Sequence, residues 1–399
     1  MGVLDAVRRL LPAGLTGRTA LSPGRKMQEE IDLSTLAVLM SVDGISKAES
    51  ALPTDNNLSA TANEQNPAHL QNSSTTPSIP GVPELDEEVE RVLALNVEAH
   101  RELVAKHVDQ QLEEMFGALE KASASAASPF AADPRMKLSM GSSSFDASQE
   151  SEEHEDFASS PVEQHLQMVE SYLRDSYGMV PRVAPSSISH PSAGDGVFVS
   201  GRVQAGRVVA LYPGMVYLPF QVQRITDAFY RERAADYTGA QQRFEDLFGT
   251  EENRNIYATQ LMDGTIINAA LGSVSVKPNL FAVGHKVNHP PKGAEPNVML
   301  CPFVFRKSMV DRLERGGHEF RNYIPNMYFK DPAVSPNWWW YLAADNDVLI
   351  RSLAYVSTRP IEDNEELFVN YRFDPNHGAV NLPEWYHPVD SEEDQMRWS

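Results

Sequence analysis

The sequence has 399 residues, 42% of them hydrophobic, and this length and composition allow one or more folded domains. Its formal net charge of −21 argues against a protein that binds nucleic acid through its overall field, but it suits a basic protein or peptide partner. The single cysteine, Cys301, excludes an intramolecular disulfide framework and a cysteine-cluster zinc site, so we expect no metal centre and a reducing compartment.

No apolar run reaches the roughly 20 residues that a membrane-spanning helix needs, so we expect a soluble, intracellular protein without a membrane partner. Residues 3–26 carry several arginines between leucines. This pattern fits a weak organellar transit peptide, although a short basic helix is the more common explanation. The nucleus or cytoplasm is the expected compartment, with the mitochondrion as the alternative.

The first half of the chain alternates helical segments with low-complexity ones. Residues 1–48 predict an N-terminal helical segment, in which apolar residues have helical spacing at 31–42. Residues 49–82 are dominated by Ser, Thr, Asn, Ala and Pro, a composition typical of a disordered linker. Residues 122–160 return to Ser and Ala and predict a second, partly acidic linker before a leading helix at 161–179.

The clearest helical signal lies between the two linkers. Apolar residues recur at spacings of three, four and seven through residues 83–121, with charged residues, above all Glu, between them. This pattern predicts a long amphipathic helix, or two helices joined near Asn96. The apolar face can pair with a helix of a partner protein, although such a stripe more often packs on its own domain.

From residue 180 onward, short runs of β-branched and aromatic residues alternate with Gly and Pro. These runs predict short strands at 196–200, 208–212, 265–268, 298–305 and 349–358. Residues 220–248 are rich in Arg, Glu, Gln and Ala and predict a helical insert. We therefore expect a mostly β domain with helical inserts at 180–375 and a C-terminal tail at 376–399, preceded by a helical and partly disordered N-terminal region.

Short motifs follow one another in a distinctive order within this domain. They are Gly194-Asp195-Gly196, Tyr212-Pro213-Gly214, Asn288-His289, Pro296-Asn297 and Glu365-Glu366-Leu367-Phe368-Val369-Asn370-Tyr371. Each alone has a plain structural explanation, such as a tight turn for the glycines. In this order they resemble the SET-domain protein methyltransferases, and the resemblance covers roughly residues 180 to 373.

The resemblance implies a SET-domain β-fold in which the Asn-His segment and the Glu-Leu-x-x-x-Tyr segment thread together as a pseudoknot, an exception to the usual rarity of threading. It implies an S-adenosyl-L-methionine site at Gly194, Asp195, Gly196, Asn288, His289 and Tyr371. It also implies catalytic roles for Tyr371 and Tyr212, where the cofactor meets a lysine channel. The implied function is methyl transfer to a lysine side chain of a protein substrate, without direct nucleic-acid binding.

Methyl transfer to lysine requires a neutral amine in line with the methyl donor. Because free lysine has a pKa near 10.4, deprotonating it at about pH 7.4 costs roughly 4 kcal/mol. An apolar, aromatic channel disfavours the charged amine and recovers part of this free energy. Positioning of the two reactants supplies much of the remaining acceleration, and neither a metal nor a nucleophile is required.

The sequence also departs from the family pattern. Pro290 and Pro291 stand where Ser and Cys commonly follow Asn-His, and the loop before Pro296 is longer. His285 and Lys286 replace the usual Arg and aromatic residue, which changes one wall of the lysine channel. Without cysteine-rich zinc segments, the C-terminal wall must come from elsewhere, such as residues 375–386 or 338–341. The segment 304–347 is a long insertion by family standards.

These departures favour an alternative, a catalytically inactive SET-fold protein that acts as a binding or interaction module through residues 83–121. The retained tyrosines Tyr212 and Tyr371, together with Asn288 and both glycines, favour the enzyme. A Gly-x-Gly dinucleotide oxidoreductase fits poorly, because the longer glycine motif and an alternating strand–helix pattern are both missing from the sequence.

Overall fold

A computed structural model describes residues 23–51, 82–125, 161–231, 239–250, 255–330, 347–373, 383 and 385–399. Most of the two predicted linkers, and the aromatic run at 338–341, lie outside these residues. The described helices are α2 (Pro23–Ala51), α3 (Val82–Leu93), α4 (Val97–Ser125), α5 (Pro161–Tyr177), α6 (Pro219–Arg231), α7 (Ala240–Phe248), α8 (Lys307–Arg315) and α10 (Ser391–Trp398). Short 3-10 helices are η3 (Pro191–Ala193), η5 (Gly284–Lys286) and η6 (Phe320–Tyr323).

Taken over all the described residues, the protein is not clearly mostly β, so the fold class predicted from the sequence holds only in part. About 45% of the described residues are helical and about 22% are in strands. Part of the difference comes from α2, which extends well beyond the apolar stretch 31–42. Its first turns bury polar side chains, Arg25 and Gln28, that carry no apolar periodicity. Tertiary contacts, rather than an amphipathic pattern, therefore explain the extra helical turns.

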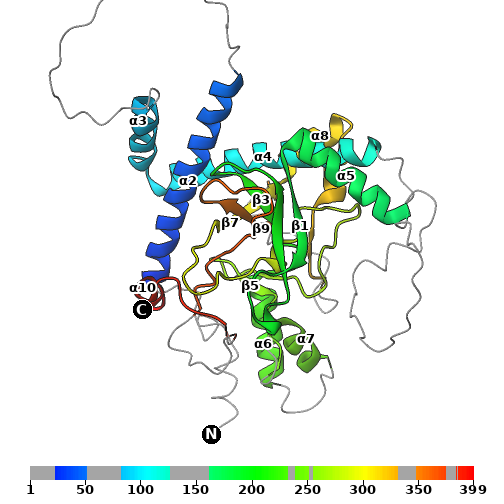
Figure 1. Ribbon diagram of the computed structural model, residues 1–399. Coiled ribbons are helices and arrows are strands. Elements are labelled where there is room, and N and C mark those ends of the chain that lie inside the picture. The colour runs from blue at the N-terminus through cyan, green and yellow to red at the C-terminus, as the bar shows by residue number, and fades with distance from the viewer. Residues whose placement is uncertain are drawn as a thin grey trace, which may run out of the picture.

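Small sheets make up the β part of the described chain (Figure 1). One is the antiparallel pair of β1 (Met179–Pro185) and β2 (Asp195–Gly201). In the next, β9 (Val348–Ser357) lies between β3 (Val208–Leu211) and β7 (Val298–Arg306) and is antiparallel to both. The last has the order β5 (Ala258–Gln260), β6 (Ile266–Asn268), β4 (Gly214–Tyr217) and β8 (Asn326–Tyr328).

The predicted strands correspond to β2, β3, β6, β7 and β9, whereas β1, β4, β5 and β8 were not predicted. Two prolines in β1 and the three-residue length of β5 and β8 weaken the sequence signal. The strand β8 belongs to the insertion 304–347 and runs parallel to β4. The insertion thus extends a sheet, and its η6 and α8 pack close to α4 and β7.

The helical segment 83–121 forms two helices, and the break falls at Asn96. The Asn96 side chain accepts a hydrogen bond from the amide of Ala99 at 2.9 Å, which caps the first turn of α4. Beyond the break, α4 buries its apolar stripe: Val104, Val108, Leu112, Met115, Phe116 and Leu119. This stripe therefore packs on its own chain and is not free to pair with a partner helix.

The helix α4 meets the sheet β3–β9–β7 and the insertion. The Phe116 ring lies 6.0 Å from that of Phe305 on β7 and 4.5 Å from that of Phe320 on η6, measured between centroids. The predicted insert 220–248 forms α6 and α7, which project from the opposite end of the molecule in Figure 1. There Phe229 and Phe244 stack 4.0 Å apart and form a second, smaller core.

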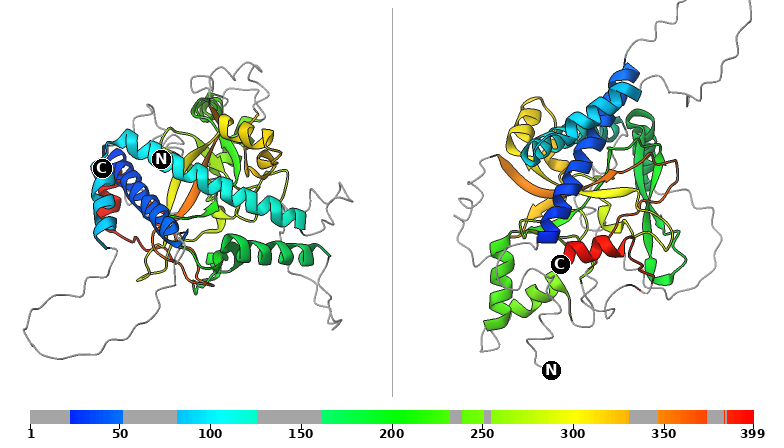
Figure 2. Two further views of the ribbon diagram at one scale, coloured as in Figure 1. Left: turned by 90° about the horizontal axis from the view of Figure 1, so that it is seen from above. Right: turned by 90° about the vertical axis from the view of Figure 1, so that its left-hand side faces the viewer.

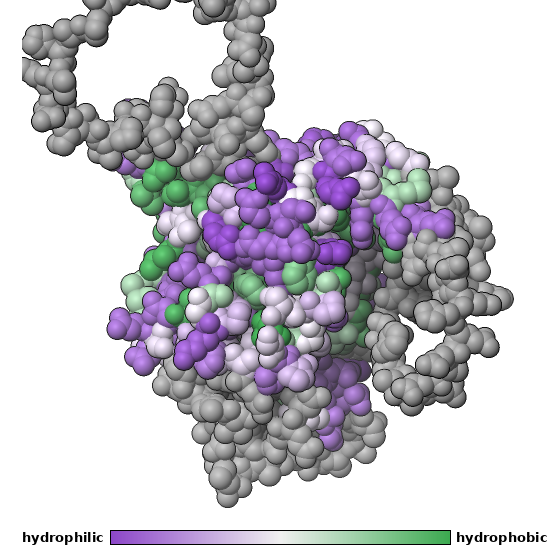
Figure 3. Space-filling view, viewed as in Figure 1, coloured by the Kyte–Doolittle hydropathy of each residue, from purple (hydrophilic) through white to green (hydrophobic). Residues whose placement is uncertain are grey.

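The helices α2 and α10 lie side by side, although they come from opposite ends of the described chain (Figure 2). The predicted C-terminal tail, 376–399, thus contains a helix that packs on the N-terminal one. On the face shown in Figure 3, hydrophilic residues dominate and hydrophobic ones form smaller groups between them. Among the described helices, none is long and apolar enough to cross a membrane.

Candidate functional site

The segment 365–371 lies between two others that are distant in sequence. On one side, the amide of Leu367 donates to Val197 O at 2.7 Å, and that of Val199 donates to Glu365 O at 3.0 Å. On the other side, the amide of Val369 donates to Asn288 O at 2.9 Å. The segment therefore joins the strand that follows Gly-x-Gly to the Asn-His motif.

The motif Pro296-Asn297 fixes the same segment through a side chain. Asn297 is almost fully buried, and its Nδ2 donates to Glu366 O at 2.8 Å. Its Oδ1 accepts from the amide of Phe368 at 2.8 Å. The oxygen and the nitrogen of one side-chain amide thus bind the backbone on either side of Leu367. Asn297 therefore holds the segment with the kinds of hydrogen bond that a neighbouring strand makes.

The two glycines of Gly-x-Gly differ in their surroundings. Gly194 has φ 60° and ψ −133°, a conformation that favours glycine, and a side chain there would meet no atom within 4 Å. Gly196 lies directly against the carboxylate of Glu366, so that a Cβ would overlap it. The face of Gly194 is thus open to a ligand, whereas that of Gly196 is filled by the protein.

The Glu366 carboxylate is buried and gathers several donors around itself. Its Oε1 accepts from Ser186 Oγ at 2.7 Å, and its Oε2 accepts from the amide of Ser187 at 2.7 Å and from the Ser187 hydroxyl. Asn288 Nδ2 lies 3.4 Å from Oε1 and donates more closely, at 3.0 Å, to Asp195 O. A buried carboxylate needs such donors, and here they link the turn that follows β1 to the Gly-x-Gly and Asn-His motifs.

His289 is fully buried, and both of its ring nitrogens have partners. Nδ1 accepts from the amide of Tyr371 at 3.2 Å, so Nε2 carries the proton and donates to His387 O at 2.6 Å. Burial lowers the pKa of His289, which keeps the ring neutral in this role. His289 therefore orients Tyr371 and ties it to the C-terminal segment.

Aromatic rings surround Tyr371 on the C-terminal side. The ring of His289 lies 5.5 Å from that of Tyr371 and 4.4 Å from that of Tyr386. Phe373 lies 5.4 Å from Tyr371 and 5.0 Å from Tyr386. Phe373 and Tyr386 thus form an aromatic group beside Tyr371 and His289. Most of the region 375–386 lies outside the described residues, so the wall expected there stays a prediction.

Two buried tyrosines, Tyr212 and Tyr355, and the partly buried Tyr371 lie close enough together to influence one another electrostatically. The Tyr371 hydroxyl donates to Val287 O at 3.0 Å, and the Tyr212 hydroxyl donates to Tyr257 O at 2.8 Å. Burial raises the pKa of Tyr212 to about 12 and those of Tyr355 and Tyr371 well above the ordinary value. All three therefore stay protonated at neutral pH.

His285 and Lys286, two of the departures noted in the sequence, lie beside Tyr257 and Asp195 respectively. The ring of His285 lies 6.1 Å from that of Tyr257, and burial, followed by the charge of Lys286, lowers the pKa of His285 to about 4. Lys286 Nζ lies 3.5 Å from the Asp195 carboxylate, and both side chains are partly exposed. This ion pair spans the Gly-x-Gly and Asn-His motifs at the surface.

All the residues that the sequence singled out therefore come together: Gly194, Asp195, Gly196, Tyr212, Asn288, His289 and Tyr371. Tyr355, Ser186 and Ser187 were not predicted. Tyr355 lies in the predicted strand 349–358, but only the pairing of β9 with β3, in which Tyr355 opposes Ala210, brings it near Tyr212. A sequence contains no direct signal for that register.

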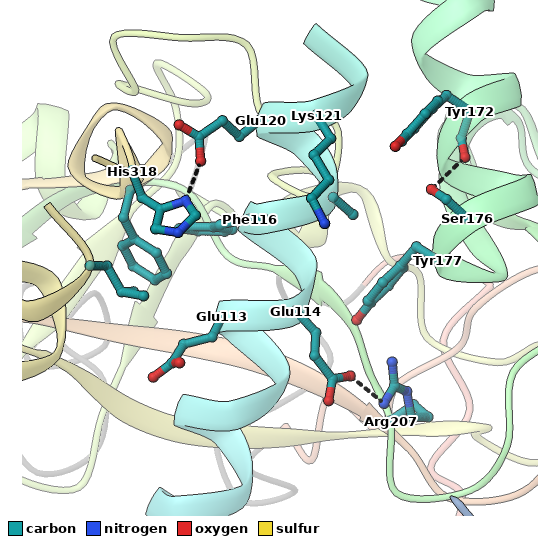
Figure 4. A pocket seen from close by; sticks show the side chains of 14 residues that line it. Glu113, Glu114, Phe116, Glu120, Lys121, Tyr172, Ser176, Tyr177, Arg207 and His318 are labelled. Atoms are coloured by element: carbon teal, nitrogen blue, oxygen red, sulfur yellow. Dashed lines mark hydrogen bonds and ion pairs between the residues drawn. The ribbon is translucent and has the colours of Figure 1, made fainter. Parts of the chain in front are cut away.

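A separate groove of about 600 Å³ lies between α4 and α5 (Figure 4). Ionisable side chains along it pair with one another: Glu114 with Arg207 at 3.2 Å, and Glu120 with His318 at 2.8 Å. None of the residues predicted for the site lines it. The groove is lined by aromatic side chains, Tyr172 and Tyr177, but the sequence motifs do not meet there. The candidate site is therefore the cluster around Glu366 and Tyr371.

Within the described residues, no group of three or more His, Cys, Asp and Glu side chains is arranged to hold a metal ion. Cys301 is buried, and burial raises the pKa of its thiol to about 12, which argues against a nucleophile. The chain matches no model of a protein family, and a search among curated proteins finds no similar sequence.

Proposed function

We propose that this protein is an S-adenosyl-L-methionine-dependent protein-lysine N-methyltransferase with a SET-domain fold. The observation that carries the proposal is the position of segment 365–371, which is hydrogen-bonded to β2 on one side and to the Asn-His motif on the other. This interleaving supports the pseudoknot that the sequence resemblance implies. It also leads the chain to Tyr371, whose amide and hydroxyl bind His289 and Val287 of the Asn-His segment.

The residues present fit a cofactor at Gly194 better than at Gly196. The open face of Gly194 allows backbone approach, and Asn288 and Tyr371 lie within the same cluster. When bound, S-adenosylmethionine supplies a methyl group on a positively charged sulfur. Gly194 and Asp195 would hold it through their backbone, since the side-chain amide of Asn288 is already engaged.

The tyrosine group suits the task of orienting a lysine amine. Because the hydroxyl protons of Tyr371 and Tyr212 are committed to backbone carbonyls, their oxygens are left to accept hydrogen bonds from the amine. When the two N–H bonds of the neutral amine donate to these two oxygens, the nitrogen lone pair is left with a single direction. Buried aromatic surroundings also disfavour the ammonium form, so that the amine sheds its proton to solvent before transfer.

Tyrosines offset the loss of the usual aromatic residue at position 286. Tyr257 and Tyr355 lie beside Tyr212 and Tyr371. The Lys286 side chain instead lies next to the Asp195 carboxylate. On the other side, Phe373 and Tyr386 form the C-terminal wall that zinc segments supply elsewhere in the family. These contacts support a channel that is aromatic despite the altered motif.

The inactive module remains the second candidate, and two contacts favour it. The polar atoms of His289 and the amide nitrogen of Asn288 are taken up by the protein itself. The ion pair of Lys286 with Asp195 also joins the two motifs at the surface. A scaffold can keep these contacts, whereas an enzyme must exchange some of them for contacts with the cofactor.

Calorimetric titration of the full chain with S-adenosylmethionine separates the two. We expect binding by the unmodified protein and by Tyr371→Phe, which keeps the ring and loses the hydroxyl. Methyl transfer to a lysine peptide array, followed with a labelled methyl group, is expected to fall about 100-fold in Tyr371→Phe, because the amine loses an orienting group.

The matched control is Tyr172→Phe, which removes a hydroxyl in the groove between α4 and α5 and is expected to leave both measurements unchanged. Absence of cofactor binding by the folded, unmodified chain would contradict the enzyme and favour the module. Full transfer activity in Tyr371→Phe would contradict the role proposed for the hydroxyl.

A further inference from the structure

The residue after Tyr371 has an unusual backbone conformation. Arg372 has φ 48°, in the left-handed region that non-glycine residues rarely adopt. Its amide donates to Asn370 Oδ1 at 3.0 Å, while the amide of Tyr371 donates to His289. Such a conformation persists only where surrounding contacts hold it, and such residues concentrate at functional sites.

The contacts that hold Arg372 come from both ends of the described chain. Its guanidinium binds the Asp32 carboxylate of α2, with Nη2 3.0 Å from Oδ1, and lies 2.8 Å from Glu393 of α10. Its carbonyl oxygen accepts from the indole nitrogen of Trp398 at 3.0 Å. The side chain is mostly buried, so these ion pairs are screened less than surface ones.

The helices α2 and α10 are also fastened to each other beside Arg372. Gly24 lies so close to the carbonyl of Met396 that any side chain at position 24 would collide with it. Arg397 lies 3.6 Å from Glu29, and the Arg25 guanidinium lies 5.9 Å from the centre of the Trp398 ring. The charges that act on Arg372 include those of Asp32, Glu29, Glu393, Asp394 and Arg397, and Arg25 in turn lies beside Glu29 and Arg397.

We propose that Arg372 is a positioning residue for Tyr371, and that α2 and α10 form a clasp that holds it. Residues 23–51 and 391–398 lie outside the region that resembles SET domains, yet they fix the backbone one residue from the proposed catalytic tyrosine. The inference rests on the proposed function for its meaning, but the clasp itself is a structural claim that can be tested without a cofactor.

Tyrosine ionisation gives a direct readout. Burial raises the pKa of Tyr371, so we expect its hydroxyl to titrate above pH 10 in the intact protein. In Arg372→Gln the clasp loses its central cation, and we expect Tyr371 to become accessible. The absorbance of tyrosinate at 295 nm should then show one additional tyrosine ionising near pH 10, in full-length protein that circular dichroism shows to be folded.

Two further comparisons assign the signal. In a Tyr371→Phe background, Arg372→Gln should add no ionising tyrosine, which separates Tyr371 from its neighbour Tyr386. Asp32→Asn leaves Arg372 in place and weakens only the contact with α2, so it should release the same tyrosine. It also tests the clasp if Arg372→Gln does not fold, and Arg372→Lys, which cannot bridge two carboxylates, should give an intermediate result.

The matched control is Arg306→Gln, which breaks another ion pair between a helix and the body of the protein, that of Arg306 with Asp109 at 3.2 Å. It is expected to leave the number of ionising tyrosines unchanged. The same count in unmodified protein, Arg372→Gln and Asp32→Asn would overturn the clasp, as would a released tyrosine that persists in the Tyr371→Phe background.

Cofactor binding separates a failure of the clasp from a failure of the proposed function. If the unmodified chain binds S-adenosylmethionine, its affinity should fall about tenfold in Arg372→Gln, because Tyr371 must then be ordered on binding. If the unmodified chain binds no cofactor, the enzyme proposal fails and the titration alone decides the clasp. Normal affinity together with a released Tyr371 would show that the clasp does not serve the cofactor site.

Discussion

At the scale of single residues, Glu366 connects more of the site than any motif does alone. Its carboxylate binds Ser186, Ser187 and Asn288 and lies directly against Gly196, where a Cβ would overlap it. The second glycine of Gly-x-Gly is therefore required by Glu366 rather than by a ligand. This assignment separates the two glycines, which look equivalent in the sequence.

The change Gly196→Ala tests this assignment. Its Cβ would overlap the Glu366 carboxylate and force apart contacts that hold segment 365–371, so we expect a loss of about 1–3 kcal/mol in the free energy of unfolding. Urea denaturation measures the change. The control is Gly117→Ala in α4, where a methyl group meets no atom within 4 Å and should stabilise the helix by about 0.5–1 kcal/mol. Equal effects of the two changes would contradict the steric role of Glu366.

The sequence identified most residues of the site but not their individual tasks. Tyr371 and Asn288 could be predicted because the order of the motifs is distinctive. The hydrogen bonds of His289 could not, since one partner, His387, comes from a segment with no motif of its own. Long-range pairs of this kind depend on the fold and leave no local pattern.

At the scale of elements, α4 supports the sheet through a polar contact inside an apolar face. Gln111 is almost fully buried; its Nε2 donates to Gly206 O at 2.9 Å, and its Oε1 accepts from the amide of Val208 at 2.7 Å. The apolar stripe of α4 was predictable from spacing alone. The glutamine was not, because a polar residue in such a stripe carries no sign that it binds a strand edge.

We expect Gln111→Leu to lower the free energy of unfolding by about 2–3 kcal/mol. Leucine has a similar size but leaves a backbone donor and a backbone acceptor of the β3 edge buried without partners. Thermal and urea unfolding measure the loss. The neighbouring Gln110 is exposed on the same helix, and Gln110→Leu is the control, with an expected change within about 0.5 kcal/mol. A loss as small as that in Gln111→Leu would contradict the contact.

At the scale of the whole molecule, the main surprise is that the first and last described helices, α2 and α10, meet beside the candidate site. The sequence predicted a separate N-terminal segment at 1–48 and a tail at 376–399. Their helices instead enclose Arg372 between Asp32 and Glu393. Charged residues read from a sequence indicate a solvated surface, so a buried cluster formed by opposite ends of a chain escapes prediction.

The same cluster makes stability depend on pH. Asp394 is buried, and burial followed by the charge of Glu393 raises its pKa to about 6, despite opposing contributions from Arg372 and Arg397. A carboxyl group whose pKa is higher in the folded state than in the unfolded chain favours folding when protonated. Its cost is therefore present above pH 6 and disappears as the pH falls from about 6 to 4.

Asp394→Asn mimics the protonated state at every pH. We expect it to raise the free energy of unfolding by about 1–2 kcal/mol at pH 7.5, a value discounted for solvent around the helix end, and by only about a third as much at pH 4.5. Urea unfolding of both proteins across this range measures the difference. If the variant is less stable than the unmodified protein at pH 7.5, attraction of Asp394 to Arg372 and Arg397 outweighs the cost of its burial. The ionised Asp394 carboxylate then stabilises the clasp instead of lowering the free energy of unfolding.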